Sequence, residues 1–253
     1  MKASGNTILV TGGGSGIGRA LAQRWHDAGN RVIVTGRRRE MLEETAQGRA
    51  NIFVHELDID DAAAIETGIG EIVAAYPDLN VLVNNAGTYK SENPTRRRDL
   101  ADAERMIVTN VLGPIRMTNA LIDHLSAQNH AAIINVSSGT AFVPYPASPT
   151  YSASKAAIHS YTAAIRPLLK GRVEVIEIIP PQVQTELTPG QSKDPNSQPL
   201  GEFADEVMAL LLGNGDQSPE EVSVERVRYF RNAERMGQFD EVLAMMVEYT
   251  PRD

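Results

Sequence analysis

Short apolar runs rich in β-branched residues alternate with segments of helical spacing along most of the chain. We expect strands at these runs, which cover residues 7–10, 31–35, 52–57, 80–84, 131–137 and 172–179. We expect helices between them, at about 16–28, 38–46, 61–75, 99–126 and 151–169. Nearly continuous apolar strands that alternate with helices are typical of a parallel sheet covered on both faces. The pattern therefore predicts an α/β fold: a single-domain doubly wound parallel sheet, the Rossmann fold, with helices on both faces.

A long polar segment separates this pattern from the C-terminal part. Residues 188–201, TPGQSKDPNSQPLG, are rich in Pro, Gly and polar side chains, which predicts a loop. Loops of this length inside a compact domain are uncommon and often cover an active site. We expect 186–201 to be a mobile lid over the substrate, and a surface excursion without function is the alternative.

The C-terminal part is predicted to contain shorter elements. The sequence favours an amphipathic helix at 202–213, a short strand at 221–224 and mostly helical structure over 225–249. We find no internal repeat and no long low-complexity segment. We therefore expect residues 1–253 to form a single dinucleotide-binding and catalytic domain, in which 202–253 is a mostly helical extension.

Composition narrows the functional classes. With 42% hydrophobic and 22% charged residues, the chain can bury a sizeable core, and its net charge of −8 argues against a nucleic-acid or anionic-membrane surface. The chain has no cysteine, and its five histidines share no metal-ligand spacing, so we expect no disulfide and no metal. No apolar run is long enough for a signal peptide or a membrane span, so we expect a cytoplasmic protein.

The stretch TGGGSGIG at 11–18 lies between the first predicted strand and the first predicted helix. Glycines there let the backbone approach a pyrophosphate, and the N-terminus of the helix favours its negative charge. The register departs from G-x-G-x-x-G, and a tight turn without a ligand is the alternative. We expect this turn to bind a dinucleotide through Gly12, Gly14, Ser15, Gly16, Ile17 and Gly18.

The end of the second predicted strand distinguishes between two dinucleotides. An acidic residue there would bind the ribose 2′-hydroxyl of NAD, whereas arginine accommodates the 2′-phosphate of NADP. In VIVTGRRR the strand ends at Gly36, Arg37 and Arg38 follow, and no acid occurs before Glu40. We therefore predict NADP(H) as the cofactor. A solvated run of charge at a helix start is the alternative, and the helix dipole disfavours it.

The stretch YSASK at 151–155 places a tyrosine and a lysine four residues apart. On a helix, Tyr151 and Lys155 lie on the same face. A chance pair on a surface helix is one interpretation. The other is a general acid, because an ordinary phenol has a pKa near ~10 and needs a nearby cation to exchange protons near neutrality.

Six motifs occur along the chain in a defined order: TGGGSGIG, LDID (57–60), NNAG (84–87), TNVLG (109–113), INVSS (134–138) and YSASK. In this order and spacing the chain resembles the short-chain dehydrogenase/reductase family from about residue 5 to residue 187. Through NVLVNNAG, AAIINVSSG and EVIEIIPPQV it is similar to one branch of that family, the DltE-like oxidoreductases. The resemblance implies an oxidoreductase that uses a nicotinamide cofactor.

The resemblance assigns roles to four catalytic residues. Tyr151 would be the acid/base at the substrate oxygen, and Lys155 would lower the pKa of the phenol and bind the nicotinamide ribose. Ser138 would donate a hydrogen bond to the substrate oxygen. The main-chain carbonyl of Asn110 would hold a water that links Lys155 to solvent. Pro114 supports the last assignment, because proline has no N–H for the carbonyl four residues earlier. A simple proline kink is the alternative.

The resemblance implies further cofactor contacts at Asp58, Ile59, Asn84, Ala86, Gly87, Pro181, Val183 and Thr185. Asp58 would accept from the adenine amino group, with Ile59 against the ring, and the three NNAG residues would line the adenine-ribose side and stabilise the sheet. Val183 and Thr185 would bind the carboxamide. Pro181 stands where the family pattern has glycine, which removes a backbone donor at this edge of the site.

We therefore expect an NADP(H)-dependent oxidoreductase that transfers hydride between nicotinamide and a small to medium carbonyl compound or secondary alcohol. A dinucleotide-binding redox-sensing regulator without turnover is one alternative, and an enzyme of the same fold that dehydrates or epimerises its substrate is another. We expect a homodimer formed through 99–126 and 151–169, and a tetramer is possible. The motifs do not identify the substrate.

Overall fold

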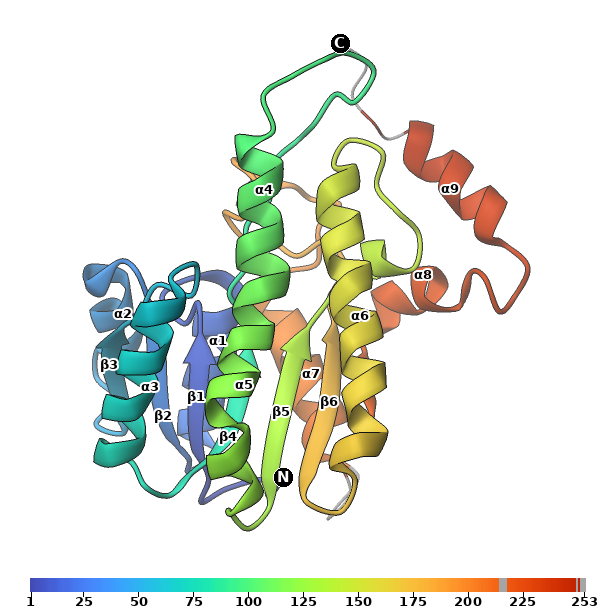
Figure 1. Cartoon of the computed structure of the whole chain (residues 1–253). Helices are drawn as coiled ribbons and strands as arrows, with labels where there is room; N and C mark the ends of the chain where they lie inside the picture. The colour runs from blue at the N-terminus through green and yellow to red at the C-terminus, as the bar shows by residue number, and fades with distance from the viewer. Residues whose placement is uncertain (214–217, 249, 251–253) are drawn as a thin grey trace.

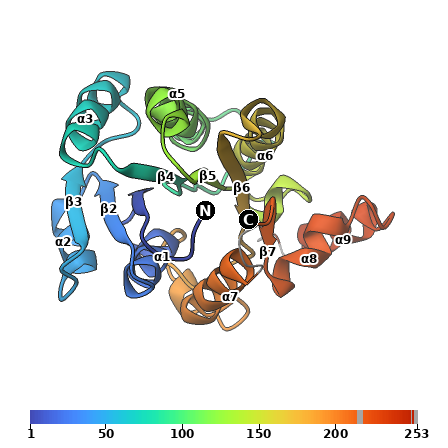
Figure 2. The ribbon, with the colours of Figure 1, turned by 90° about the horizontal axis from the view of Figure 1, so that it is seen from below.

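The computed structural model describes residues 1–213, 218–248 and 250. Seven strands within these residues form one sheet, whose strand order is β3-β2-β1-β4-β5-β6-β7 and whose pairs are all parallel (Figures 1 and 2). The strands are β1 Thr7–Thr11, β2 Arg31–Gly36, β3 Ile52–Glu56, β4 Leu79–Asn84, β5 Ala131–Val136, β6 Val173–Ile179 and β7 Glu221–Ser223. The order reverses beside β1, so the carboxyl ends of β1 and β4 form the switch point of a doubly wound sheet.

Helices cover both faces of the sheet (Figure 2). The helices in the described part are α1 Gly16–Asp27, α2 Arg39–Ala46, α3 Ala62–Ala75, α4 Ala101–Ile107, α5 Gly113–Ser126, α6 Pro149–Leu169, α7 Leu200–Leu212, α8 Arg228–Asn232 and α9 Phe239–Glu248. α1, α2 and α7 lie on one face, and α3, α5 and α6 lie on the other. The predicted doubly wound α/β fold is confirmed.

Alternation along the strands fills two apolar cores. Ile8 and Val10 of β1 pack on one face with Trp25 of α1 and Phe203 of α7. Leu9 packs on the opposite face, in the core formed with α3 and α5. Both faces of a parallel strand are buried in this way, which explains the nearly continuous apolar runs of the sequence.

The helix predicted over 99–126 is interrupted, which corrects the sequence-based expectation. α4 and α5 are joined by a π-helical turn, Val108–Leu112, in which the N–H of Gly113 donates to the carbonyl of Val108, five residues earlier. Pro114 is the second residue of α5 and has no N–H to donate to Asn110, so the regular i to i−4 ladder fails here. The chain continues in the same direction through the wider turn (Figure 1).

The C-terminal part follows the prediction closely. α7 and the short strand β7 are present, and β7 pairs with β6. Helical structure then resumes at Glu225–Val227, α8 and α9, while Tyr249 lies outside the described residues. Within the described part of the chain, we find no helix that is both long and apolar enough to cross a membrane.

Candidate active site

Tyr151 and Lys155 lie in the first two turns of α6, beside the end of β5. The helix begins at Pro149, a residue suited to the first turn because its φ is fixed near helical values. Lys155 Nζ donates to the carbonyl of Val136 at 2.9 Å and lies 5.7 Å from the centroid of the Tyr151 ring. Since Lys155 is only 5% exposed, the two residues are not a chance pair on a surface helix.

Ser138 follows β5 and begins the 3-10 turn Gly139–Ala141. Its Oγ accepts hydrogen bonds from the backbone N and the Oγ1 of Thr140, at 3.2 and 3.1 Å. A serine hydroxyl has one proton and two lone pairs, so the proton remains available for donation. The Ser138 hydroxyl lies close enough to the phenol of Tyr151 to lower its pKa, so the two predicted catalytic hydroxyls are neighbours.

Burial dominates the electrostatics of this pair. Burial raises the pKa of Tyr151 to about 12, Ser138 lowers it in part through its hydrogen bond, and Tyr89 raises it further. Burial also lowers the pKa of Lys155 to about 8, and the negative charge of Glu177 opposes this decrease. The direction for Tyr151 is opposite to the lowering expected from Lys155, because desolvation of the phenolate outweighs a lysine that is itself desolvated.

Asn110 lies within the π-helical turn and is 1% exposed. Its Oδ1 accepts from the N–H of Thr88 at 2.8 Å, and its Nδ2 donates to the carbonyl of Thr88 at 2.9 Å and to Ser154 Oγ at 3.1 Å. The side chain therefore ties the loop after β4 to α6. A Cβ added to Gly87 would lie 3.4 Å from Asn110 Oδ1 and 3.7 Å from Lys155 Nζ, so the backbone of Gly87 passes close to both residues.

The glycine-rich turn after β1 is shaped by close backbone contacts. Gly12 has a φ of +66°, and a Cβ at this position would lie 2.8 Å from Ala86 Cα. Asn85 Nδ2 donates to the carbonyl of Gly12 at 3.3 Å, and Arg19 Nε donates to the carbonyl of Gly14 at 3.0 Å. Asn85 is thus a structural residue, as its position in NNAG suggests, while Arg19 is a support that the sequence analysis did not identify.

The start of α1 faces the segment after β6. Gly16 has a φ of +52°, and a Cβ there would lie 3.4 Å from Thr185 Cγ2. Ser15 precedes the helix and is exposed, and its hydroxyl makes no capping bond. Val183 is 2% exposed, and its carbonyl accepts from Gln191 Nε2 at 2.6 Å. Two segments named as cofactor-binding, after β1 and after β6, therefore lie side by side.

Two residues of the turn face inward instead. Ile17 packs against the core under α1 and α7. Gly18 is buried, and its Cα lies against Asn85 and Gly12, where a side chain would not fit. The side chain of Ile17 and the small size of Gly18 therefore shape the turn, and contact of these two residues with a dinucleotide stays a prediction.

Arg37 and Arg38 lie between β2 and α2. Arg38 is the N-cap residue of α2, and its guanidinium has no partner among the described residues. Arg37 Nη1 lies 3.9 Å from Asp60 Oδ2, an acid that the sequence analysis did not place near the arginines. Asp60 is itself fixed by a 2.6 Å hydrogen bond from Thr109 Oγ1. Two guanidiniums are available at this corner, but one of them has a competing carboxylate.

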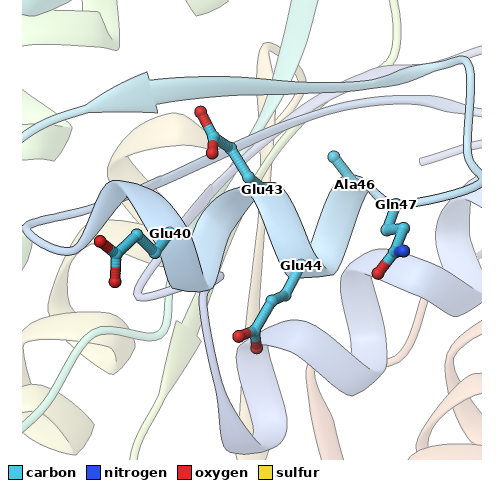
Figure 3. Close-up of a pocket in the computed structure, with 5 residues that line it drawn as sticks. All are labelled: Glu40, Glu43, Glu44, Ala46 and Gln47. Carbon is cyan, nitrogen blue, oxygen red and sulfur yellow. The ribbon is translucent and has the colours of Figure 1, made fainter.

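A shallow concavity on α2 lies on the outer surface of the same region (Figure 3). It is lined by Glu40, Glu43, Glu44, Ala46 and Gln47. Two of these carboxylates are paired, Glu43 with Arg39 and Glu44 with Arg19, both at 2.8 Å. Its negative charge does not suit a phosphate, and α2 flanks the opposite edge of the sheet from α6 (Figure 2). We therefore do not assign this concavity to the active site.

The residues after β3 divide into one accessible and one buried side chain. Asp58 is partly exposed, and its Oδ1 accepts from the N–H of Asp60 at 3.0 Å. Ile59 is 6% exposed and packs in the core against Gly113, where an added Cβ would lie 2.7 Å from Ile59 Cδ1. Contact of Ile59 with an adenine ring stays a prediction.

Asn84 belongs to a buried polar layer beneath the site. Its Nδ2 donates to Asn135 Oδ1 at 2.8 Å and to Thr118 Oγ1 at 3.3 Å, and Asn135 Nδ2 donates to Thr162 Oγ1 at 2.9 Å. These bonds connect α5, β4, β5 and α6. The Asn84 side chain therefore stabilises the sheet, and its contact with the adenine-ribose side stays a prediction. Ala86 and Gly87 remain at the surface of the loop.

The C-terminal part packs against the turn that follows Ser138. A Cβ added to Gly139 would lie 2.8 Å from Val227 Cγ2 and 3.5 Å from Phe230 Cβ. Val143, four residues later, is packed with Ala233 and neighbouring residues of α9. Residues far apart in the sequence thus fix the turn that carries Ser138, and no local motif indicated this contact.

The search of known proteins identifies relatives across the whole chain. The family described as short chain dehydrogenase matches residues 6–196. The uncharacterized oxidoreductase DltE of Bacillus subtilis (strain 168) is 35% identical over 249 residues, which cover 97% of this chain and 98% of that protein. Sulfoacetaldehyde reductase 2 of Chromohalobacter salexigens is 39% identical over 186 residues, which cover 72% and 74%.

A solved structure shows the same architecture. The short chain dehydrogenase of Burkholderia cenocepacia J2315, in complex with NADP, is similar with a TM-score of 0.83 at 26% identity, and the match covers 99% of this chain and 100% of that chain. The structural match extends through the C-terminal part, whereas the family match ends at residue 196. Together with the order of strands and the match over 6–196, this similarity shows that the chain belongs to the short-chain dehydrogenase/reductase family of oxidoreductases.

Proposed function

We propose that this oxidoreductase uses NADP(H) to interconvert a small to medium carbonyl compound and the corresponding secondary alcohol. The observation that carries the proposal is the proximity of the Ser138 hydroxyl and the phenol of Tyr151 to the buried Lys155, whose Nζ lies 5.7 Å from the centroid of the Tyr151 ring. These three groups offer a proton, a hydrogen-bond donor and a positive charge at one end of the sheet. That combination suits a substrate oxygen that gains or loses a proton.

The backbone around the first turn fits a dinucleotide. Gly12 lies so close to Ala86 that a side chain would fill the space, and the exposed Ser15 precedes the N-terminus of α1. Gly14, Gly16, Asp58, Gly87, Pro181, Val183 and Thr185 are proposed as further contacts of the dinucleotide. Arg38, with Arg37 beside it, offers the charge that a 2′-phosphate requires. When bound, the nicotinamide supplies or receives the hydride.

In the direction of reduction, the proton moves from the Tyr151 Oη to the substrate oxygen. Ser138 donates a hydrogen bond to the same oxygen and stabilises its developing negative charge. Lys155 stabilises the phenolate that remains, and it orients the cofactor ribose. Asn110 holds the loop and α6 in register, and its carbonyl is proposed to hold a water through which the proton is replaced. The reverse sequence oxidises an alcohol.

The substrate side of the site is proposed to involve Tyr89, whose ring contacts that of Tyr151 edge to face at a centroid distance of 5.2 Å. Residues 186–201 are proposed to close over the substrate as a lid. In the structure this segment contains the 3-10 turn Gln191–Lys193 and a backbone bridge between Val183 and Gln198. Small polar aldehydes are a first class to test, because the Chromohalobacter relative is named as a sulfoacetaldehyde reductase.

A homodimer in the cytoplasm completes the proposal. Ile107, Leu112 and Leu168 are 38%, 37% and 72% exposed and belong to the two helical segments that we expect to pair across a two-fold axis. Light scattering after size-exclusion chromatography distinguishes monomer, dimer and tetramer. A dimer that dissociates on Leu168→Glu would support pairing through α6, whereas an unchanged dimer would place the interface elsewhere.

The redox-sensing regulator is not favoured, since the relatives are oxidoreductases and a regulator does not require a catalytic tyrosine. A dehydratase or epimerase would require further acid or base groups near Ser138 and Tyr151. Net oxidation of NADPH with a carbonyl substrate distinguishes the reductase from both alternatives.

The decisive experiment is NADPH consumption with a broad panel of aldehydes and ketones, with NADH in parallel. We expect turnover with NADPH that is lost in Tyr151→Phe. If NADPH binds and no carbonyl compound is reduced, the regulator becomes the better interpretation. A clear preference for NADH would contradict the role given to Arg37 and Arg38.

A further inference from the structure

A fully buried carboxylate lies in β6 and faces α6. Glu177 is 0% exposed, and its Oε2 accepts a hydrogen bond from His159 Nδ1 at 2.8 Å. Its other oxygen, Oε1, has no hydrogen-bond partner among the described residues. Burying a carboxylate without compensation costs free energy, so nearby positive charge must offset this one.

Charged and titratable groups face Glu177 from the elements packed against β6. In the described residues they are Lys155, His159 and Arg166 of α6, Glu221 of β7 and Arg231 of α8, while β5 contributes the neutral amide of Asn135. The charge of Glu177 acts on both Lys155 and Arg231. Glu177 thus interacts electrostatically both with Lys155 and with Arg231 in the C-terminal part.

Most of these groups already have partners. Arg231 donates to both oxygens of Glu221, at 2.7 and 2.8 Å. Ligand atoms of His159, Glu177 and Glu221 lie within 4.8 Å of one another, but the bidentate guanidinium neutralises Glu221 and leaves little reason for a cation there. Lys155 has a neutral carbonyl as its hydrogen-bond acceptor, so among the described residues Glu177 is the buried acid that balances it.

We propose that Glu177 is a positioning residue for Lys155: its buried negative charge, held in place by His159, keeps the lysine ammonium charged between Val136 and Tyr151. Lys155 and His159 are four residues apart and therefore lie on the same face of α6. The carboxylate of Glu177 on β6 thus accepts a hydrogen bond from His159, and Lys155 supplies a positive charge near it. The kinetic consequences rest on the proposed function, whereas the charge state of Lys155 does not.

The sign of the effect follows from burial. Burial lowers the pKa of Lys155 to about 8, and Glu177 acts in the opposite direction. Removing the charge of Glu177 therefore lowers the pKa of Lys155 further and leaves less ammonium at neutral pH. The run VEVIEII contains two acids, Glu174 and Glu177, among apolar residues; this was the sequence signal for Glu177, and the sequence analysis did not use it.

The direct test is a lysine titration by NMR. The chain has five lysines, at positions 2, 90, 155, 170 and 193, so side-chain 13C labelling gives a simple spectrum, and Lys155→Arg identifies the signal of interest. In Glu177→Gln we expect the Lys155 midpoint to fall by about one pH unit or more. Glu174→Gln, on the same strand, removes a carboxylate that pairs with the N-terminal ammonium and should leave the midpoint unchanged. Equal midpoints in the wild type and Glu177→Gln would overturn the proposal.

Two further variants separate charge from folding. Glu177→Asp keeps the charge and should restore a midpoint above that of Glu177→Gln. Glu177→Met removes the charge without leaving an unpaired amide, and it serves if Glu177→Gln fails to fold. A midpoint that falls in the Met and Gln variants, and is raised again by Asp, supports the proposal. A midpoint that falls equally in all three assigns the effect to packing instead.

The pH dependence of NADPH-linked turnover supplies a second readout. Loss of the lysine charge should move the alkaline limb of kcat/KM to lower pH in Glu177→Gln by the shift found by NMR. A merely structural role would lower kcat/KM at every pH without moving the limb. If the wild type shows no turnover, the proposed function fails, while the NMR titration still decides the role of Glu177.

Discussion

The glycine-rich turn after β1 and the catalytic groups after β5 meet at the same end of the sheet, but they are held there by different means. Gly12 and Asn85 are fixed by backbone contacts between two adjacent strand ends. Ser138 and Lys155 depend on α6, on β6 and on the C-terminal part, whose Val227 closes against Gly139. Both regions are built from segments that are distant in the sequence, but the first is held by contacts between the ends of two adjacent strands, and the second by the packing of α6 and the C-terminal part.

The difference shows in the charges as well. The turn after β1 offers N–H groups and glycines, and at its outer corner the guanidinium of Arg38 has no partner among the residues that the structure describes. The catalytic region contains a half-buried phenol, a buried ammonium and a buried carboxylate, and the charge of the carboxylate acts on the pKa of the ammonium. Changes in the first region should affect cofactor binding and folding, and changes in the second should affect chemistry and its pH dependence.

The largest effect is expected from Tyr151→Phe. Removing the general acid should reduce kcat/KM by about 10²–10⁴-fold while the affinity for NADPH is retained, because the turn after β1 is untouched. Steady-state kinetics and fluorescence titration of NADPH measure the two quantities. Tyr161→Phe, on the same helix but bonded to Thr118, is the matched control and should keep its activity. Equal losses of binding and turnover would show that the two regions are not separable.

Gly12→Ala tests the other region. A Cβ at Gly12 would meet Ala86, and a φ of +66° is unfavourable for alanine, so we expect about 2–3 kcal/mol loss in the free energy of unfolding. NADPH affinity should also fall. Gly48→Ala is the control, since Gly48 has a φ of +74° and nothing within 4 Å of an added Cβ. Urea denaturation should show a smaller loss for the control, and equal losses would mean that contact with Ala86 is unimportant.

The dependence of stability on pH tests the buried pair. The folded-state pKa of Lys155, about 8, lies below its ordinary 10.5, so the unfolded chain binds more protons between these values and stability should rise with pH there. The pKa of Tyr151, about 12, lies above its ordinary 10.0, so its contribution should decrease from pH 10 upward. Each limb amounts to at most about 1.4 kcal/mol per pH unit.

Denaturant unfolding at pH 8, 9 and 10 measures the rising limb. Lys155→Met should remove that limb, whereas Tyr151→Phe should leave it in place. A rising limb that persists in Lys155→Met would show that another group causes it.

The smallest effect is expected at the outer corner of the cofactor site. Arg38→Ala should reduce the preference for NADPH over NADH by about tenfold, the effect of one charge-assisted hydrogen bond. Arg39→Ala is the control, because Arg39 is already paired with Glu43 and Glu56. The ratio of kcat/KM for the two cofactors is the readout. A similar change of the kcat/KM ratio in both variants would indicate that the overall positive charge of this corner, and not a specific contact of Arg38, sets the cofactor preference.

Much of the fold could be predicted, because strands such as VIVT and NVLV are apolar at nearly every position, as burial of both faces requires. The helix at 99–126 was predicted without its π-helical turn, although Pro114 gave the reason for one. The sequence named candidate site residues but not the orientation of their side chains: the structure shows that the side chains of Asn84 and Ile59 are buried. Sequence position along a loop does not fix which way a side chain packs.

By itself, the sequence determined the order of strands and helices along the chain, the glycine-rich turn after the first strand and the spacing of Tyr151 and Lys155. These features depend on hydrophobic periodicity and on contacts within one turn of chain. The tertiary structure decided that Glu177 faces Lys155, that Asp60 approaches Arg37 and that Val227 supports Gly139. Such contacts depend on the packing of distant segments. Burial at these contacts shifts the pKa of a group away from its ordinary value.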